Sequence, residues 1–434
     1  MQARSATGDG LAAEFTLRAA QLALWPLHAL MSIPSVLFFA ALTAALVYPE
    51  KQLYEMDRVL FGLLVVSVAT RAVVLREPLL AVGRATWPMI GLTALAVASL
   101  LGQPFDKEAW SQVATKFLVP FALFHLAPLV FNEERRFRQF EIFALIILAY
   151  LSFTSIAFLA GTDSLIFPRY ITDQSLGYHL DRARGPMLQA VANGVSLNML
   201  GLLALHAFHR GSVRGVKMWL LLASVPIAIL ATMTRSVWLS FAATLAWLAF
   251  LSSNRSLRRA GVALLMVAGL ALALILTADG RDGAFRDRLQ EEGPVDFRAA
   301  VYAGSYDMFL ARPLLGWGSH QMPGELPRYV SGYHDKMLYP HNTYLELLVE
   351  HGIVGLALYL WLMWELWRLR FGSGRTSERH GFLDGEFQRL WPILLMVYWV
   401  NAAAVVMSYQ FINGLLFAMA GMLAAQRRCE AARI

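Results

Sequence analysis

The chain has 434 residues, of which 57% are hydrophobic and 15% charged, and its mean hydropathy is +0.51. Soluble domains carry roughly 25% charged residues, so this composition excludes an ordinary soluble protein and indicates a polytopic membrane protein. The positive residues behind the net charge of +7 gather in short loops, which argues against a nucleic-acid partner. The single cysteine, Cys429, excludes an internal disulfide and a cysteine-based metal site.

Twelve apolar segments are each about long enough to cross ~30 Å of hydrocarbon as a helix. They cover residues 33–48, 59–75, 87–102, 112–130, 140–160, 187–208, 217–233, 236–251, 260–279, 343–368, 390–407 and 410–426. Before them, residues 12–31 alternate apolar and polar positions, which predicts an amphipathic helix lying on the membrane. No cleavable signal peptide is expected. We therefore expect one all-α membrane domain over residues 1–434.

The distribution of Lys and Arg predicts the orientation. The short loops after the even-numbered segments are rich in arginine, for example Arg135, Arg136 and Arg138. The positive-inside rule places such loops, and with them both termini, in the cytoplasm. Two longer loops, residues 161–186 and 280–342, are then expected on the outer face of the membrane. That face is the periplasm if the membrane is a bacterial inner membrane.

The long outward loop, residues 280–342, is the main hydrophilic break in the chain, and we expect it to contain short helices. Residues 295–311 predict an amphipathic helix with Val301, Met308 and Phe309 on one side. Pro313 should end this helix, and Gly316-Trp317-Gly318 should form a tight turn.

His341 is the strongest candidate for catalysis. It follows Pro340 and precedes the apolar run Tyr344–Leu366, so it should lie at the N-terminal end of an outward-facing helix. A helix N-terminus favours the neutral imidazole, which can accept a proton from a hydroxyl. Asn342 is a good helix cap and its amide could also orient a sugar, while Tyr344 could contact the acceptor or support the site. The alternative is that His341 only caps the helix.

Outward arginines are the second element of the predicted site. They lie in three separate loops: Arg184 before the span at 187–208, Arg235 at a tight hairpin tip, and Arg286, Arg288 and Arg298 in the long loop. Guanidinium groups bind phosphate oxygens bidentately, so these arginines together predict a site for a lipid-linked diphosphate. The alternative for any one of them is contact with lipid headgroups.

Three ionisable residues, Arg71, Lys116 and His125, fall inside predicted spans, where such groups are functional candidates by default. Lys116 could instead extend toward the membrane surface. The outward carboxylates are scattered and lack the paired acidic motif of a metal–phosphate site. The sequence therefore predicts chemistry without a metal or cofactor.

Four sequence stretches resemble the O-antigen ligase/polymerase superfamily of membrane glycosyltransferases. They are Thr234-Arg235-Ser236-Val237-Trp238-Leu239, Arg298 followed by Tyr302, Pro313-Leu314-Leu315-Gly316-Trp317-Gly318, and Pro340-His341-Asn342-Thr343-Tyr344-Leu345-Glu346 through His351-Gly352-Ile353-Val354-Gly355. The likeness is best over residues 184–360, and the twelve-span layout agrees with it over the whole chain.

The resemblance implies a GT-C-like fold with about twelve transmembrane helices and a donor glycan linked to undecaprenyl diphosphate. By motif, the family's catalytic histidine falls on His341, and its donor-phosphate arginines fall on Arg235 and an arginine of the long loop. The expected activity is transfer of O-antigen glycan to the lipid A–core oligosaccharide.

Two rival functions remain open from the sequence. An O-antigen polymerase would share donor and fold but extend another lipid-linked glycan. A transporter or flippase for the lipid-linked glycan belongs to a different class, and it has no need for a proton acceptor at the outer mouth.

Overall fold

The computed structural model describes residues 32–48, 55–76, 82–177, 180–277, 293–332, 337–371 and 382–431. In these ranges every regular element is a helix. The principal helices are α2 (Pro34–Ala44), α3 (Met56–Leu75), α4 (Thr86–Leu100), α5 (Lys107–Val113), α6 (Val119–Val130), α7 (Glu134–Leu159), α8 (Ala190–Arg210), α9 (Val216–Ala231), α10 (Arg235–Ala246), α11 (Arg255–Thr277), α13 (Gly293–Ala311), α14 (Met322–Glu325), α15 (Thr343–Arg368), α16 (Gly385–Ala402) and α17 (Gln410–Ala431).

Each of the twelve predicted spans overlaps a helix of the structure. Among the described residues, six helical stretches are long and apolar enough to cross a membrane, and they include the continuous run Lys107–Val130. Four further apolar helices in the same ranges are shorter, among them α2 and α4. The described part of the chain is thus all-helical and typical of a multi-pass membrane protein, and the crossing of the membrane by all twelve segments stays a prediction. The predicted surface helix at 12–31 lies outside the described residues.

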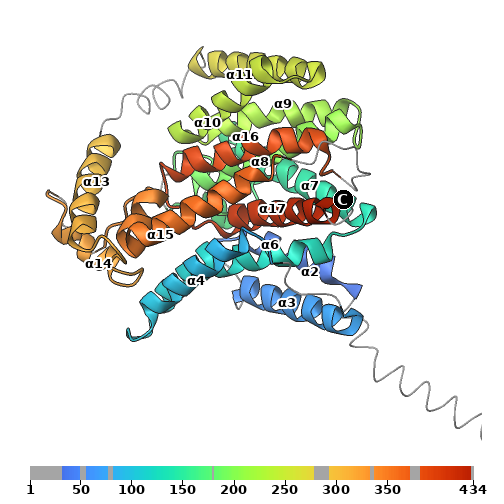
Figure 1. The fold of residues 1–434 in the computed structure, drawn as a ribbon. Coiled ribbons are helices and arrows are strands. Elements are labelled where there is room, and N and C mark those ends of the chain that lie inside the picture. Colours follow the sequence, from blue (N-terminus) through green and yellow to red (C-terminus); the bar gives the residue numbers. More distant parts are fainter. Residues whose placement is uncertain are drawn as a thin grey trace, which may run out of the picture.

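Most of the helices form one bundle, while α13 and α14 lie together at one end of it (Figure 1). α15 begins beside α13 and runs from that end into the bundle. The predicted helix at 295–311 is confirmed, because α13 spans Gly293–Ala311 and ends before Pro313. Val301 and Met308 of α13 are fully buried, and Phe309 packs against the same small core. The long hydrophilic segment is therefore partly folded onto the end of α15.

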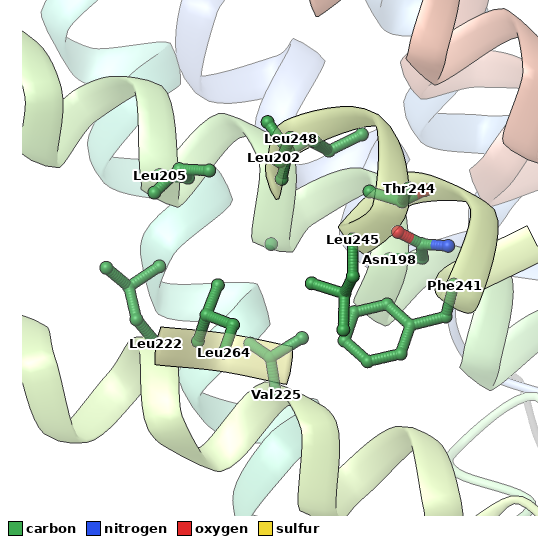
Figure 2. A pocket seen from close by; sticks show the side chains of 11 residues that line it. Asn198, Leu202, Leu205, Leu222, Val225, Phe241, Thr244, Leu245, Leu248 and Leu264 are labelled. Carbon is green, nitrogen blue, oxygen red and sulfur yellow. The ribbon is translucent and has the colours of Figure 1, made fainter. Parts of the chain in front are cut away.

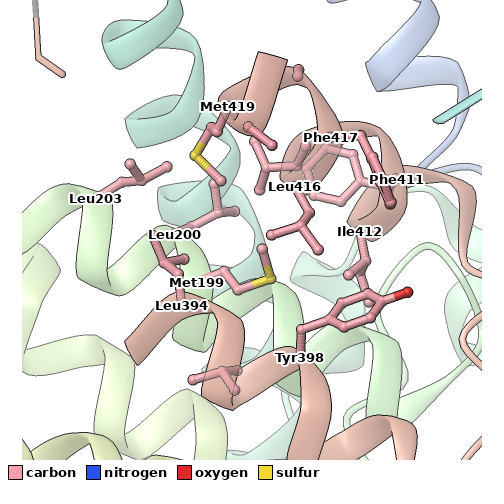
Figure 3. Packing of buried hydrophobic residues seen from close by; sticks show 14 of the residues in the cluster. Met199, Leu200, Leu203, Leu394, Tyr398, Phe411, Ile412, Leu416, Phe417 and Met419 are labelled. Carbon is pink, nitrogen blue, oxygen red and sulfur yellow. The ribbon is translucent and has the colours of Figure 1, made fainter. Parts of the chain in front are cut away.

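The centre of the bundle is packed from α8, α16 and α17. Figure 3 shows Met199 and Leu200 of α8 meeting Leu416 of α17 and Tyr398 of α16, all of them buried. The Tyr398 hydroxyl donates a hydrogen bond to Asn413 Oδ1 (3.0 Å), so its one polar atom is satisfied inside this core. These contacts fix the helices whose ends carry the candidate site.

A small cavity of about 20 Å³ lies among α8, α9, α10 and α11 (Figure 2). Its lining is apolar apart from Asn198 and Thr244. The Asn198 side chain is buried, and both its amide atoms lack a hydrogen-bond partner among the described residues. A cavity of this size holds about one water molecule. It is too small and too apolar to be a substrate site.

Two asparagines of α8 therefore give opposite predictions for stability. Asn193 donates from Nδ2 to Ser155 Oγ (2.9 Å) and Ala183 O (3.0 Å), whereas Asn198 makes no such bond. Asn193→Leu should destabilise the protein by about 1–3 kcal/mol, because it leaves buried groups unpaired. Asn198→Leu should be neutral or stabilising. Thermal unfolding of the purified variants in detergent checks both, and an equal loss in the two variants would contradict the assignment.

Candidate active site at the start of helix α15

The chain is non-helical from residue 337 through Asn342 and enters α15 at Thr343. Asn342 is the N-cap of α15, and its side-chain oxygen accepts hydrogen bonds from Tyr344 N (3.0 Å) and Leu345 N (3.1 Å). The cap is thus Asn342 rather than His341. His341 itself has φ +50, a left-handed conformation that is uncommon outside glycine. Backbone strain of this kind is concentrated at functional sites. The turn places the imidazole beside the helix end instead of on the helix surface.

The first turns of α13 lie next to His341. The rings of Phe297 and His341 are 6.1 Å apart, centre to centre. His341 is exposed, although the Phe297 ring packs against it. Its partial burial, and secondly the positive charge of Arg298, lowers the pKa of His341. The histidine is therefore neutral at physiological pH, which is the form that accepts a proton.

The loop between α16 and α17 forms another wall of this region. Thr343 Oγ1 donates to Val405 O (2.9 Å) and accepts from Met407 N (2.9 Å). The Tyr302 hydroxyl of α13 reaches Ala403 O at 3.4 Å. These contacts hold the start of α15 between α13 and the end of α16.

Tyr344, predicted to contact the acceptor or support the site, has its hydroxyl directed into the bundle. It donates to Trp399 O of α16 at 3.2 Å. The side chain is half-buried, and the observed contact tethers the start of α15 to α16. Support of the site is the role that this contact favours.

Arg235 is the first residue of α10 and is half-buried. α10 is joined to α16 by a hydrogen bond from Asn401 Nδ2 to Ser240 Oγ (2.9 Å). Asn401 is next to the last residue of α16, and Ser240 lies about one and a half turns after Arg235. Arg235 therefore stands at the same end of the bundle as the loop that holds Thr343.

Arg184 is buried and hydrogen-bonds its own loop. Its guanidinium donates to the carbonyl oxygens of Ile171 (2.7 Å), Asp173 (3.1 Å) and Leu176. Burial lowers the pKa of Arg184, partly offset by Asp173, and the group remains charged because an arginine pKa is so high. The terminal nitrogens thus already serve three carbonyls. A contact of Arg184 with a diphosphate stays a prediction, while its ordering of the loop is observed.

Arg286 and Arg288 lie outside the described residues, so the structure gives no place for them. Arg298, the predicted loop arginine that the structure describes, acts on His341 through its charge. Within the described ranges, no group of three or more His, Cys, Asp or Glu side chains could hold a metal ion.

α15 is broken at Gly352, where the backbone has φ +65 and ψ −166. The stretch 313–318 fills the break and makes backbone hydrogen bonds on both sides of it. They run from Ile353 N to Pro313 O (2.9 Å), Val354 N to Leu314 O (3.4 Å), Trp317 N to Val349 O (2.9 Å) and Gly318 N to Glu350 O (2.8 Å). This is the structural role of the Pro-Leu-Leu-Gly-Trp-Gly motif: it replaces the helix's own hydrogen bonds where they stop.

Two glycines make this approach feasible. A Cβ on Gly352 would lie 2.2 Å from Leu314 O, and a Cβ on Gly316 would lie 2.4 Å from Val349 O. Both residues also have positive φ. The 313–318 motif of the long loop and the glycine motif of α15 are therefore one structure, joined by backbone contacts.

The sequence patterns did not predict Phe297, the contacts of Thr343 or the break in α15. Phe297 belongs to no motif, and Thr343 lies in the Pro340–Glu346 motif without a predicted role, so only their packing reveals what they do. The signal for the break was the pair of glycines in His351-Gly352-Ile353-Val354-Gly355, which lies inside an otherwise continuous apolar run.

Residues 218–360 match the family model described as O-antigen ligase. The match includes Arg235, Arg298, the 313–318 stretch and His341, and the resemblance predicted from these residues is confirmed. No curated protein matches the chain.

Proposed function

From the O-antigen ligase family domain that residues 218–360 carry, we propose that the protein transfers O-antigen glycan from undecaprenyl diphosphate to the lipid A–core oligosaccharide. The family covers ligases and polymerases, which are glycosyltransferase-like enzymes. The observation that carries the proposal is the pairing of His341, kept neutral beside the helix end, with the positive charge of Arg298. A proton acceptor and an anion-binding group are the two parts that such a transfer needs.

In the proposed reaction, His341 takes the proton of the acceptor sugar hydroxyl as its oxygen attacks the anomeric carbon of the donor. The bond between that carbon and the diphosphate oxygen breaks, and undecaprenyl diphosphate leaves with the electron pair. In-line attack inverts the anomeric centre. Arg235 and Arg298 stabilise the charge that develops on the leaving group, together with Arg184, Arg286 or Arg288 where these reach it.

The proposed setting is a bacterial inner membrane with both termini in the cytoplasm and the site facing the periplasm, in a GT-C-like arrangement. The surrounding lipids hold the donor by its polyprenyl chain. No metal or cofactor is proposed, because arginines supply the positive charge that a divalent cation gives elsewhere.

The test uses the purified full-length protein in detergent with a lipid-diphosphate glycan, lipid A–core and EDTA. A glycan ladder on lipid A–core is the expected product. Growth of the glycan on the lipid carrier alone would identify a polymerase. Neither product, with movement of the lipid-linked glycan across a vesicle membrane, would favour a transporter.

Arg235→Lys should lower the transfer rate although it keeps the charge. Lysine loses the planar fork that binds phosphate oxygens in pairs. A hydrogen bond to a charged group is worth about 1.5–3 kcal/mol, which predicts a drop of about 10- to 100-fold. Initial rates at saturating acceptor and varied donor measure it.

Arg255→Lys is the matched control, because Arg255 is likewise the first residue of its helix, α11, and is exposed. It should keep the wild-type rate. Full activity of Arg235→Lys would remove the bidentate contact from the proposal.

A further inference from the structure

A buried ionic cluster links the middle of the bundle to the segment of α15 that follows His341. Lys116 Nζ lies 2.9 Å from Glu346 Oε1 and 3.5 Å from Glu350 Oε1. The three side chains are 8%, 2% and 0% exposed. Lys116 thus does not extend to the membrane surface.

The two glutamates lie one helical turn apart, so they present both carboxylates on one face of α15. Both precede the break at Gly352. We call residues 343–351 the N-segment of α15. Lys116 comes from a different part of the chain, the run Lys107–Val130, whose helix α6 packs against α17. The cluster therefore connects the N-segment to the body of the bundle.

Lys116 sits in a π-helical turn, Ala114–Leu118, between α5 and α6. Single π turns inside α-helices are rare and are frequent at functional sites. Next to Lys116, the Phe117 ring lies 6.1 Å from the ring of His351, the last residue of the N-segment. The widened turn thus brings two successive side chains against the N-segment.

Stability alone gives a poor reason for this cluster. Removing charged groups from water is costly, and a buried ion pair is often no more stabilising than apolar residues of the same size. Here one ammonium faces two carboxylates, and the His351 ring lies 3.8 Å from Glu350 Oε2. Such an arrangement is sensitive to geometry, because each charge is compensated only in one orientation.

The N-segment needs an orienting contact because the break at Gly352 separates it from the rest of α15. Thr343 and Tyr344 tie its start to the 403–409 loop and to Trp399 of α16, and the 313–318 stretch fixes its end at the break. The remaining restraint on rotation of the segment about its own axis is in its middle. There the contacts of Lys116 with two carboxylates on one face hold the segment.

We propose that Lys116 is a positioning residue, which through Glu346 and Glu350 sets the rotation of the N-segment and with it the place of His341 beside Arg298. The inference rests on the proposed function for its effect on rate, but not for its effect on structure. Lys116 has no contact with substrate in this scheme.

The main test compares wild type with two variants of the full-length protein. Lys116→Met leaves two carboxylates buried without their cation, which is strongly destabilising. The second variant is therefore the uncharged triple Lys116→Met/Glu346→Gln/Glu350→Gln. In each of the two variants that folds, backbone amides of the N-segment should exchange with deuterium faster than in wild type. Exchange in α17 should be unchanged.

Two kinetic readouts accompany the exchange measurement. A displacement of about 1 Å at a catalytic group lowers the rate on the order of 10²-fold, so kcat should fall while KM for the lipid-diphosphate glycan stays the same. The acid limb of the pH profile should move up toward the ordinary histidine value, because His341 leaves the surroundings that lower its pKa. A purely structural loss would reduce the amount of active protein without moving this limb.

Lys107→Met is the matched control. Lys107 opens α5 and pairs with Glu55 at the exposed surface (2.5 Å), so its loss should change neither exchange nor kinetics. Unchanged exchange, kcat and acid limb in the uncharged triple would overturn the positioning role. A raised KM at constant kcat would overturn it too, since it would place Lys116 on the substrate. If wild type transfers no glycan, the proposed function fails, and the exchange measurement still decides the role of Lys116.

Discussion

His341→Ala is expected to abolish glycan transfer while leaving the protein folded. Proton transfer by a positioned side chain contributes about 10²- to 10⁴-fold, and this variant removes it entirely. Helix α15 keeps its cap, because that cap is the side chain of Asn342 and not of His341. The ladder assay on protein of wild-type thermal stability measures the loss.

His320→Ala is the control for losing an outward-facing histidine. His320 Nδ1 lies 3.0 Å from Asp106 Oδ2, in a pair away from the α15 cap. Transfer should persist in this variant. Near-normal transfer by His341→Ala would show that another group accepts the proton.

The pH dependence of wild type tests the same assignment. Protonated His341 cannot act as a base, so activity is present above its pKa in the folded protein and is lost as the pH falls through it. Burial and Arg298 lower that pKa, and the acid limb of kcat/KM should therefore lie below the usual histidine value of about 6.5. An acid limb above that value would contradict the neutral histidine.

Gly352→Ala is expected to be among the most destabilising single substitutions in the chain. The new Cβ would meet Leu314 O at 2.2 Å, and the residue must keep φ +65. Left-handed strain and overpacking together cost about 2–5 kcal/mol. Since whole domains are stable by only about 5–15 kcal/mol, we expect a large drop in thermal stability and in transfer.

Gly324→Ala in α14 is the control for that drop, because its Cβ would meet nothing within 4 Å. Gly352→Asn should lose stability as Ala does. Asn favours positive φ only with ψ of about +47, whereas Gly352 has ψ −166, and the Asn Cβ would meet the same carbonyl oxygen. Wild-type stability of Gly352→Ala would refute the described break.

Much of the fold follows from the sequence because hydrophobic length alone locates helices in a membrane protein. Each predicted span coincides with a helix, although α16 begins five residues earlier than predicted and ends before residue 407. The helix at 295–311 was predictable from its apolar side and from Pro313. The break at Gly352 was not, since a glycine within an apolar run is also compatible with an unbroken helix.

Most residues of the candidate site were predictable from the sequence, but the contacts that they make were not. Pro340 and Asn342 predicted the start of α15, and the arginines of three loops predicted the proposed anion-binding groups. That the charge of Arg298 acts on His341 depends on how α13 packs. That Arg184 donates to three carbonyls depends on the fold of residues 169–177. The contact of Lys116 with Glu346 joins positions 230 apart in the chain, and no local pattern encodes it.

Residues 313–318 bridge the break in α15 by hydrogen bonds, and this limits what the family's motif reveals about the substrates of its members. The hydrogen bonds that join Pro-Leu-Leu-Gly-Trp-Gly to α15 on both sides of Gly352 are between main-chain atoms, and main-chain atoms carry no information about a sugar. A sequence signature of this kind identifies the fold of the family and does not identify the glycan or its acceptor. Enzymes that attach glycans to different acceptors can therefore share this signature unchanged, and side chains outside the signature must determine the choice of acceptor.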